Sequence, residues 1–340
     1  QDDFALNQPL SGFAAEAIAT LDPESPTHAM DVVSVIEATL DNPMAVLYAE
    51  QSHARGEKIA AMKAEGYDYQ DRMDAVEDVE WPQPLAEMLE ALFEIFAPSH
   101  PWVSPDALAP KSVVRDMYER AMTFGEFCAF YKVQRSEGLV LRYLTDAYRA
   151  LRQTVPESER TEELADVISW LVEVVRSTAS SLIDEWEALT HPDAPGAASR
   201  PGTTTGEGPR PVHTFTSNTR AFRVAVRNAM FRRVILAADD DFEALAALEP
   251  TGSAMTSDVW EDALGDYWDE FDEIDDGPDA RSPAFFVVEE SRRGRLWTVR
   301  QIINDPDGDH DWSIAATVDL DECDEAGELV VRTRTFTRLD

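Results

Sequence analysis

Arginines with helical spacing lie in the segment Phe127–Pro156. Arg135, Arg142 and Arg149 follow one another at intervals of seven residues. On an α-helix such positions drift by only about 20° per interval, so the three side chains would form one stripe. The segment also holds a fourth arginine and three interleaved tyrosines: Arg152, Tyr131, Tyr143 and Tyr148. Because guanidinium groups bind phosphates bidentately and aromatic rings stack on unpaired bases, these residue types suit a surface for single-stranded nucleic acid.

The same segment also fits an ordinary amphipathic helix whose arginines are merely solvated. Its apolar positions follow helical spacing and predict a buried face of Val140, Leu144, Ala147 and Leu151. Gly138 lies inside the expected helix, where glycine costs about 1 kcal/mol relative to alanine. We therefore expect close helix packing or a bend at this glycine.

A second group of arginines follows in the stretch 217–238. Arg220, Arg223 and Arg227 would share one helix face, and we take Arg223 and Arg227 as further candidates for nucleic-acid contact. The rest of the group is Arg232 and Arg233. Fifteen acidic residues and no basic one follow between positions 239 and 276, so pairing within the chain is a strong alternative for this group.

Motifs that would identify an enzyme are missing from the sequence. No phosphate-binding P-loop, paired metal-binding histidines or serine nucleophile elbow is present. Acidic strings such as Asp269–Asp272 imitate a helicase magnesium box, but they arise by chance in so acidic a chain. The loop Asn304–Asp311 lacks the glycine and glutamate of a calcium loop and predicts a polar hairpin turn. The sequence therefore indicates no catalytic residue, metal ligand or cofactor in this chain.

The composition is extremely acidic, with 66 Asp and Glu against 29 Lys and Arg and a formal net charge of −37. An acidic surface poor in lysine is typical of halophile proteins. The charge argues against general nucleic-acid binding, so any such contact must come from local arginine patches. Two distant cysteines and the absence of a long apolar run favour a cytoplasmic protein without membrane contact. Because the chain begins at Gln1, we expect it to be a piece of a longer protein.

Pattern changes along the chain predict two domains joined by a linker. Residues 1–190 read as an all-α domain of helices separated by prolines, including one over 136–154. Residues 191–216 are rich in Pro, Gly, Ser and Thr and predict a flexible linker. In residues 217–340 a long helix precedes alternating segments, which predict a smaller α+β domain. The expected strands are Ala284–Glu289, Leu296–Ile303, Trp312–Val318 and Leu329–Phe336. We expect the helix to pack on a curved antiparallel sheet, as in cystatin-like or nuclear-transport-factor-like folds.

Several stretches of the chain resemble one family. The run from Arg135 to Arg142 is similar to a Glu-Gly-x-x-x-Arg segment in the C-terminal helical domain of exosome-associated DExH helicases. More broadly, the sequence of the chain resembles a C-terminal region of unknown function that is fused to DEAD/DEAH-box superfamily 2 helicases of actinobacteria and other prokaryotes. The matching stretches include Leu6–Ala14, Leu21–Pro43, Ser112–Phe127, Gly138–Glu157, Ala221–Val234, Gly277–Glu290 and Asp305–Trp312.

This resemblance implies an accessory or regulatory region that packs on the helicase ATPase core in cis and guides single-stranded RNA or DNA. ATP and Mg²⁺ would then belong to motor domains outside this chain. Arg142 and Arg149 would be the best candidates for phosphate contacts. Two other interpretations stay open: a protein–protein scaffold, and a small-molecule-binding module or enzyme within residues 217–340.

Overall fold

The computed structural model describes residues 8–104, 106–178, 215–291 and 294–339. The chain divides into two compact units, Gln1–Pro192 and Asp193–Asp340. The predicted linker lies outside the described residues, apart from its last two positions. Those two residues belong structurally to the C-terminal unit. Phe215 packs edge-on against Phe222, and the amide of Thr216 donates to Asp324.

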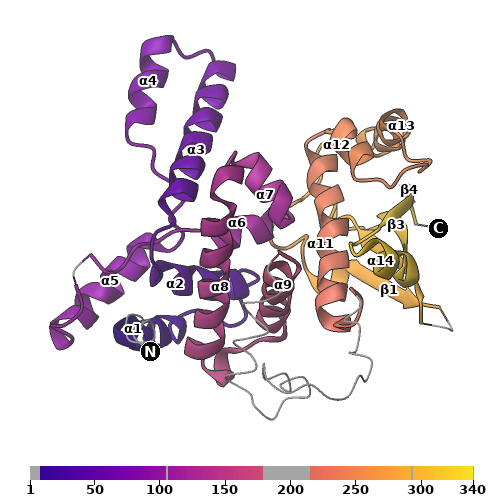
Figure 1. Cartoon of the computed structure of the whole chain (residues 1–340). Coiled ribbons are helices and arrows are strands. Elements are labelled where there is room, and N and C mark those ends of the chain that lie inside the picture. Colours follow the sequence, from indigo (N-terminus) through magenta and orange to yellow (C-terminus); the bar gives the residue numbers. More distant parts are fainter. Residues whose placement is uncertain (1–7, 105, 179–214, 292–293, 340) are drawn as a thin grey trace, which may run out of the picture. The chain divides into compact units, whose positions relative to one another are not determined.

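The described part of the N-terminal unit is built from α-helices and short 3₁₀ turns (Figure 1). Helix α8 contacts α2 and α9, and α2 also contacts α6. Helices α3 and α4 lie side by side as an antiparallel hairpin that projects from the other helices of this unit. The bounds are α1 Gln8–Ile18, α2 His28–Ala38, α3 Met44–Ala64, α4 Tyr69–Glu77, α5 Ala86–Phe96, α6 Val113–Glu119, α7 Phe124–Phe130, α8 Glu137–Thr154 and α9 Glu162–Thr178.

Local sequence signals account for most of these helix ends. Pro43 directly precedes α3, and Gly66 follows its end with a φ of +87° that favours glycine. Helix α7 starts with a capping box, in which Thr123 accepts from the amide of Glu126 and the Glu126 carboxylate accepts from the amide of Thr123. These ends agree with the helix boundaries that the sequence predicts.

The C-terminal unit places helices against one antiparallel sheet whose strands follow the order β1-β2-β3-β4. The sheet is a meander, with an irregularity between Ala315 and Ala316 where β3 pairs with β4. Its inner face packs on α11 and α13, through ring contacts of Trp297 with Phe222 and of Trp312 with Tyr267. The bounds are α11 Thr219–Ala238, α12 Phe242–Ala247, α13 Ser257–Trp268, β1 Phe286–Glu290, β2 Leu296–Ile302, β3 Trp312–Asp319, α14 Leu320–Ala326 and β4 Arg332–Arg338.

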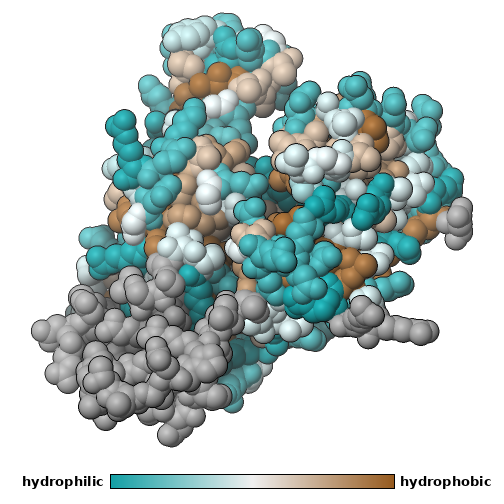
Figure 2. All heavy atoms as spheres, turned by 45° about the vertical axis from the view of Figure 1, so that its right-hand side comes forward, coloured by the Kyte–Doolittle hydropathy of each residue, from teal (hydrophilic) through white to brown (hydrophobic). Residues whose placement is uncertain are grey.

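The structure confirms the predicted fold class, an α-helical domain followed by an α+β domain with a small antiparallel sheet. All four predicted strands are present within a few residues of their expected bounds. The closer likeness to cystatin-like or nuclear-transport-factor-like folds stays a prediction. Figure 2 shows hydrophilic side chains over most of the visible surface, with hydrophobic ones in small separate areas. This distribution fits the acidic composition of the chain.

Candidate nucleic-acid interface

Helix α8 carries three of the arginines that the sequence singles out: Arg142, Arg149 and Arg152. It begins at Glu137, directly after a 3₁₀ turn at Gln134–Ser136. Gly138 therefore lies in the first helical turn and not in the helix interior. A Cβ added to Gly138 would meet no other heavy atom within 4 Å, so the predicted close packing at this residue is wrong. The predicted apolar face of α8 is confirmed, because Val140, Leu144, Ala147 and Leu151 are all fully buried.

The arginines of the predicted stripe differ in position and in partners. Arg142 is open, with 77% of its side chain exposed. Arg149 is 36% exposed, and both residues approach the carboxylate of Asp146, at 3.8 Å and 3.7 Å respectively. Arg152 donates to the hydroxyl of Tyr148 at 2.9 Å. Arg135 lies on the 3₁₀ turn before α8, so a single helical stripe from Arg135 to Arg149 does not form.

The tyrosines cannot serve as the base-stacking platform that the sequence suggested. Tyr131, Tyr143 and Tyr148 are 7%, 5% and 3% exposed. The hydroxyl of Tyr131 donates to Asp116 at 2.7 Å, and the hydroxyl of Tyr143 donates to Glu37 at 2.8 Å. Tyr143 and Tyr148 lie on the buried side of α8, and Tyr131 is buried at the C-terminal end of α7. The arginine face is therefore left without exposed aromatic rings from this set.

A cationic segment nevertheless remains at the α7–α8 junction, defined here as Lys132, Arg135 and Arg142. Lys132 and Arg135 are exposed, and neither forms a hydrogen bond or ion pair with another side chain in the described part of the chain. The exposed Leu139, at 42%, lies between Arg135 and Arg142 in the sequence. Lys132 was not predicted from the sequence, although lysine is rare in this chain. Its backbone is left-handed, with a φ of +56°. The segment offers charge for phosphate contacts rather than rings for base stacking.

The second arginine group is split between the surface and the interior. Arg223 is exposed and has no hydrogen-bond or ion-pair partner among the residues that the structure describes. Arg227 is only 6% exposed, so little of its side chain is available for the predicted contact with nucleic acid. Arg233 forms a buried ion pair with Glu249, with an N–O distance of 2.9 Å and side-chain exposures of 3% and 2%. The Glu249 carboxylate also accepts from the hydroxyl and the amide of Thr333, at 2.6 Å and 2.9 Å.

A buried polar centre lies behind α8, on its inner side. The carboxylate of Glu37 is completely buried and accepts from the hydroxyl of Tyr143 and from the amides of Val114 and Arg115, at 2.8, 2.8 and 3.2 Å. The two amides belong to the first turn of α6, where free N–H groups favour an acceptor. Burial raises the pKa of Glu37 to about 7, although these three hydrogen bonds oppose the shift. Glu37 thus ties α2, α6 and α8 together.

Lys111 complements this arrangement at the same, C-terminal end of α2. Its ammonium group is fully buried and donates to the carbonyl oxygens of Leu40 and Ala109, both at 2.7 Å. Burial lowers the pKa of Lys111 to about 8, while the charges of Glu37 and Asp41 act in the opposite direction. The cation therefore satisfies carbonyl groups just beyond the C-terminal end of α2, where positive charge is favourable.

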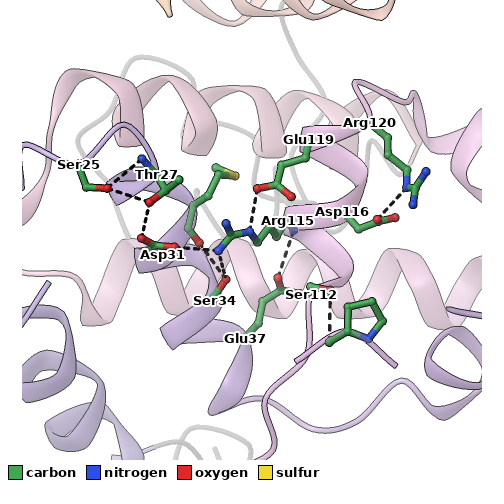
Figure 3. A network of polar contacts seen from close by, with 12 residues as sticks. Ser25, Thr27, Asp31, Ser34, Glu37, Ser112, Arg115, Asp116, Glu119 and Arg120 are labelled. Atoms are coloured by element: carbon green, nitrogen blue, oxygen red, sulfur yellow. Dashed lines mark hydrogen bonds and ion pairs between the residues drawn. The ribbon is translucent and has the colours of Figure 1, made fainter. Parts of the chain in front are cut away.

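Arg115 extends the polar network toward the surface (Figure 3). Its guanidinium group donates to Asp31 and Glu119, both at 2.8 Å, and to the hydroxyl of Ser34 at 3.1 Å. The side chain of Arg115 is 15% exposed. This arginine is therefore committed to internal contacts between α2 and α6.

Glu50 is the least satisfied group of the polar centre. It is 2% exposed, and neither carboxyl oxygen has a hydrogen-bond partner among the described residues. Burial raises its pKa to about 9, with smaller contributions from the negative charges of Asp116 and Glu37, whereas Arg120 opposes the shift. Asp116 is itself held by Arg120 at 2.8 Å and by Tyr131 at 2.7 Å. Glu50 is therefore protonated at neutral pH.

The sequence patterns do not predict this buried polar centre, except at one residue. Glu37 interrupts the apolar run from Val32 to Ala38, and a charge inside such a run indicates a buried partner. No comparable signal marks Glu50 or Lys111. Their environment comes from helices that are distant in the sequence.

The acidic loop after β2 forms the predicted hairpin turn. Asp305 is 4% exposed and accepts from the amides of Asp309 and His310, at 3.0 and 2.6 Å. Gly308 occupies the turn with a φ of +74°. Across the described residues, no group of three or more His, Cys, Asp or Glu side chains has an arrangement that would hold a metal ion. The Asp305 carboxylate thus stabilises the loop itself.

Comparisons with known proteins place the chain in one family. A family model with the description "Domain of unknown function (DUF3516)" matches residues 1–336. No curated protein and no solved structure matches the chain. Within the part that the structure describes, no helix has both the length and the apolar character needed to cross a membrane. With nearly its whole length matched, the chain belongs to the DUF3516 family of domains of unknown function.

Proposed function

We propose that this chain is the accessory region of an ATP-dependent DEAD/DEAH-box helicase and that its N-terminal unit contacts the phosphate backbone of single-stranded RNA or DNA. The motor domains, with their ATP and Mg²⁺, lie outside this chain in this proposal. The ATPase core is the partner in cis, and the parent protein is cytoplasmic. Resemblance to the C-terminal regions of such helicases supports the association with a motor.

The observation that carries the nucleic-acid contact is the exposure of the cationic segment. Arg142 is 77% exposed, and its nearest carboxylate oxygen, on Asp146, lies 3.8 Å away. An exposed ion pair of this kind contributes only about 0.3–0.5 kcal/mol, so a phosphate can replace it. Lys132 and Arg135 have no such partner among the described residues. In a chain with a net charge of −37, three accessible cations within eleven residues concentrate the attraction for an anion.

The rigid inner face of α8 supports this role. Tyr143 and the apolar residues Val140, Leu144 and Leu151 fix the helix against its neighbours. Arg142 therefore starts from an ordered backbone, and less freedom is lost when its guanidinium group binds. Because the rings of this helix are buried, binding through the segment should depend on phosphate charge rather than on base sequence.

A protein–protein scaffold is the second candidate function. Ile95 and Trp102 are 75% and 67% exposed, and exposed apolar side chains of this size often anchor protein interfaces. His100 supports Trp102 by an edge-to-face contact at 5.2 Å and stacks on Phe96 at 3.7 Å. Such a surface suits the motor core as well as an independent protein.

Charge reversal tests the nucleic-acid contact directly. A fluorescein-labelled single-stranded oligonucleotide is titrated with the full chain at several salt concentrations, and binding is followed by anisotropy. Arg135→Glu with Arg142→Glu should weaken binding and lower the salt slope by about 1.4, since each lost phosphate contact removes about 0.7. The matched control is Lys58→Glu with Lys63→Glu, which makes the same charge change at two exposed positions of α3. Equal behaviour of the two double variants, or unchanged binding in the first, would refute the contact.

A further inference from the structure

The outward face of the sheet in the C-terminal unit departs from the acidic character of the chain. Along β2, burial alternates: Trp297 and Val299 face the core, whereas Leu296, Thr298 and Arg300 are exposed. The pairing registers extend this outward face across β3 and β4. Thr298 pairs with Thr317, and Arg300 lies in one row with Ala315 and Thr335. One face of the sheet is therefore open and carries mainly small, hydroxyl-bearing and basic side chains.

Two arginines at this face are free to bind an anion. Arg300 is exposed and has no hydrogen-bond or ion-pair partner among the described residues. Arg334 is exposed, and within the described residues its side chain forms one polar contact, a 3.1 Å hydrogen bond to the hydroxyl of Thr317. Arg332 is different, because Glu322 neutralises it in an ion pair. Two strand spacings separate β2 from β4, or roughly 10 Å, so the two free guanidinium groups can reach different phosphates.

Carboxylates are sparse at this face, although the chain has 66 acidic residues among 340. On β2, β3 and β4 the only acidic residue is Asp319, at the very end of β3. Asp319 pairs with Leu296 and accepts from the amides that begin α14, and on β1 Glu289 pairs with Thr298. In a chain with a net charge of −37, two exposed arginines without carboxylate partners favour an anionic partner over a basic or apolar one.

We propose that the outward face of β2–β4, through Arg300 and Arg334, is a second binding surface for the phosphate backbone of single-stranded nucleic acid. Threonine hydroxyls at Thr298 and Thr335 add donors of the kind that bind phosphate oxygens. The identity of the polyanion rests on the proposed function, whereas the surface itself is independent of α8. No aromatic residue lies at an outward position of β2–β4, so the contact is made to the backbone and not to the bases.

The test compares two double variants of the full chain with a fluorescein-labelled oligouridylate, by anisotropy over a range of salt concentrations. Arg300→Glu with Arg334→Glu should weaken binding and reduce the salt slope by about 1.4. Arg300→Gln with Arg334→Gln should do the same to a smaller degree without placing new carboxylates in the sheet. Circular dichroism of each variant establishes that the sheet is intact. Lys58→Glu with Lys63→Glu is again the control for net charge.

The outcomes separate this inference from the proposed function. Weaker binding by the sheet variants, with the control unchanged, supports the inference even if the α8 variants bind normally. Sheet variants that bind like the unaltered chain, or like the control, overturn the inference while a defect in the α8 variants preserves the proposed function. If the unaltered chain does not bind the oligouridylate at low salt, both are overturned.

Discussion

Replacing Glu50 by glutamine should make the N-terminal unit more stable at neutral and alkaline pH. Glutamine keeps nearly the same shape but cannot ionise. In the folded protein the pKa of Glu50 is about 9, against 4.5 for an ordinary glutamate. Between these two pH values the folded state retains a proton that the unfolded chain has lost. The stability of the unaltered protein must therefore fall as the pH rises through this window.

The size of the effect follows from the width of the window. Each pH unit between 4.5 and 9 removes about 1.4 kcal/mol from the free energy of unfolding. At pH 7 the accumulated loss is about 3 kcal/mol, and at pH 8 about 5 kcal/mol. Near pH 5 both side chains are neutral when folded, so the Glu50→Gln protein should match the unaltered protein closely. The advantage of glutamine should then grow steadily with pH.

Urea unfolding measures this difference. Both proteins are unfolded at several pH values between 5 and 8, and circular dichroism follows the transition of the N-terminal unit. Glu37, whose pKa is also raised, titrates in both proteins, so its contribution largely cancels in the comparison. Glu65→Gln provides the control, because this exposed glutamate lies at the other end of α3 and should leave the pH dependence unchanged.

This pH dependence arises only if Glu50 is neutral in the folded protein. If Glu50→Gln shifts stability by the same amount at pH 5 and pH 8, the carboxyl group is ionised in the folded protein. In that case Arg120 compensates the charge more strongly than burial and Asp116 oppose it. A destabilised Glu50→Gln protein at pH 8 would refute the argument outright.

Two further changes test the buried networks. Tyr143→Phe should lower the free energy of unfolding by about 1–3 kcal/mol, because the buried Glu37 carboxylate loses a donor; an unchanged urea midpoint would contradict the role of this hydrogen bond. Arg233→Ala should destabilise the C-terminal unit by about 3–5 kcal/mol, since Glu249 would stay buried without its cation. Thermal unfolding checks the second change, and restored stability when Glu249 is also replaced by leucine would identify the uncompensated charge as the cause.

Elements that depend on local signals could be predicted from the sequence. The apolar spacing of α8 identifies Val140, Leu144 and Leu151 as buried, and the structure confirms all three. Helix α4 and helix α14 escaped prediction because neither has a strong apolar period. Asp319 starts α14 by accepting from the amides of Asp321 and Glu322, a short-range polar signal that is easily lost in an acidic stretch.

The buried polar centre could not be predicted from the sequence, because its contacts join residues that are distant in the sequence. Glu37 meets Val114 and Tyr143, which lie 77 and 106 residues away in the sequence. A helical period shows which side chains share a face, but it cannot show what that face packs against. Tyr143 next to Arg142 illustrates the limit: adjacent positions point about 100° apart, and only the tertiary structure decides that the ring is buried.

The pairing of charges decides which arginines can act at the surface. Arg115 and Arg233 form ion pairs with carboxylates inside the protein. Arg142 and Arg300 stay accessible to solvent. Salt near 1 M would shorten the screening length to about 3 Å and remove long-range repulsion between the acidic surface and a polyanion. It would also remove most of the gain from counterion release. Binding under such conditions must therefore come from direct guanidinium–phosphate contacts at close range. In the proposed function, the exposed arginines of α8 and of the sheet would provide these contacts despite the overall charge of −37.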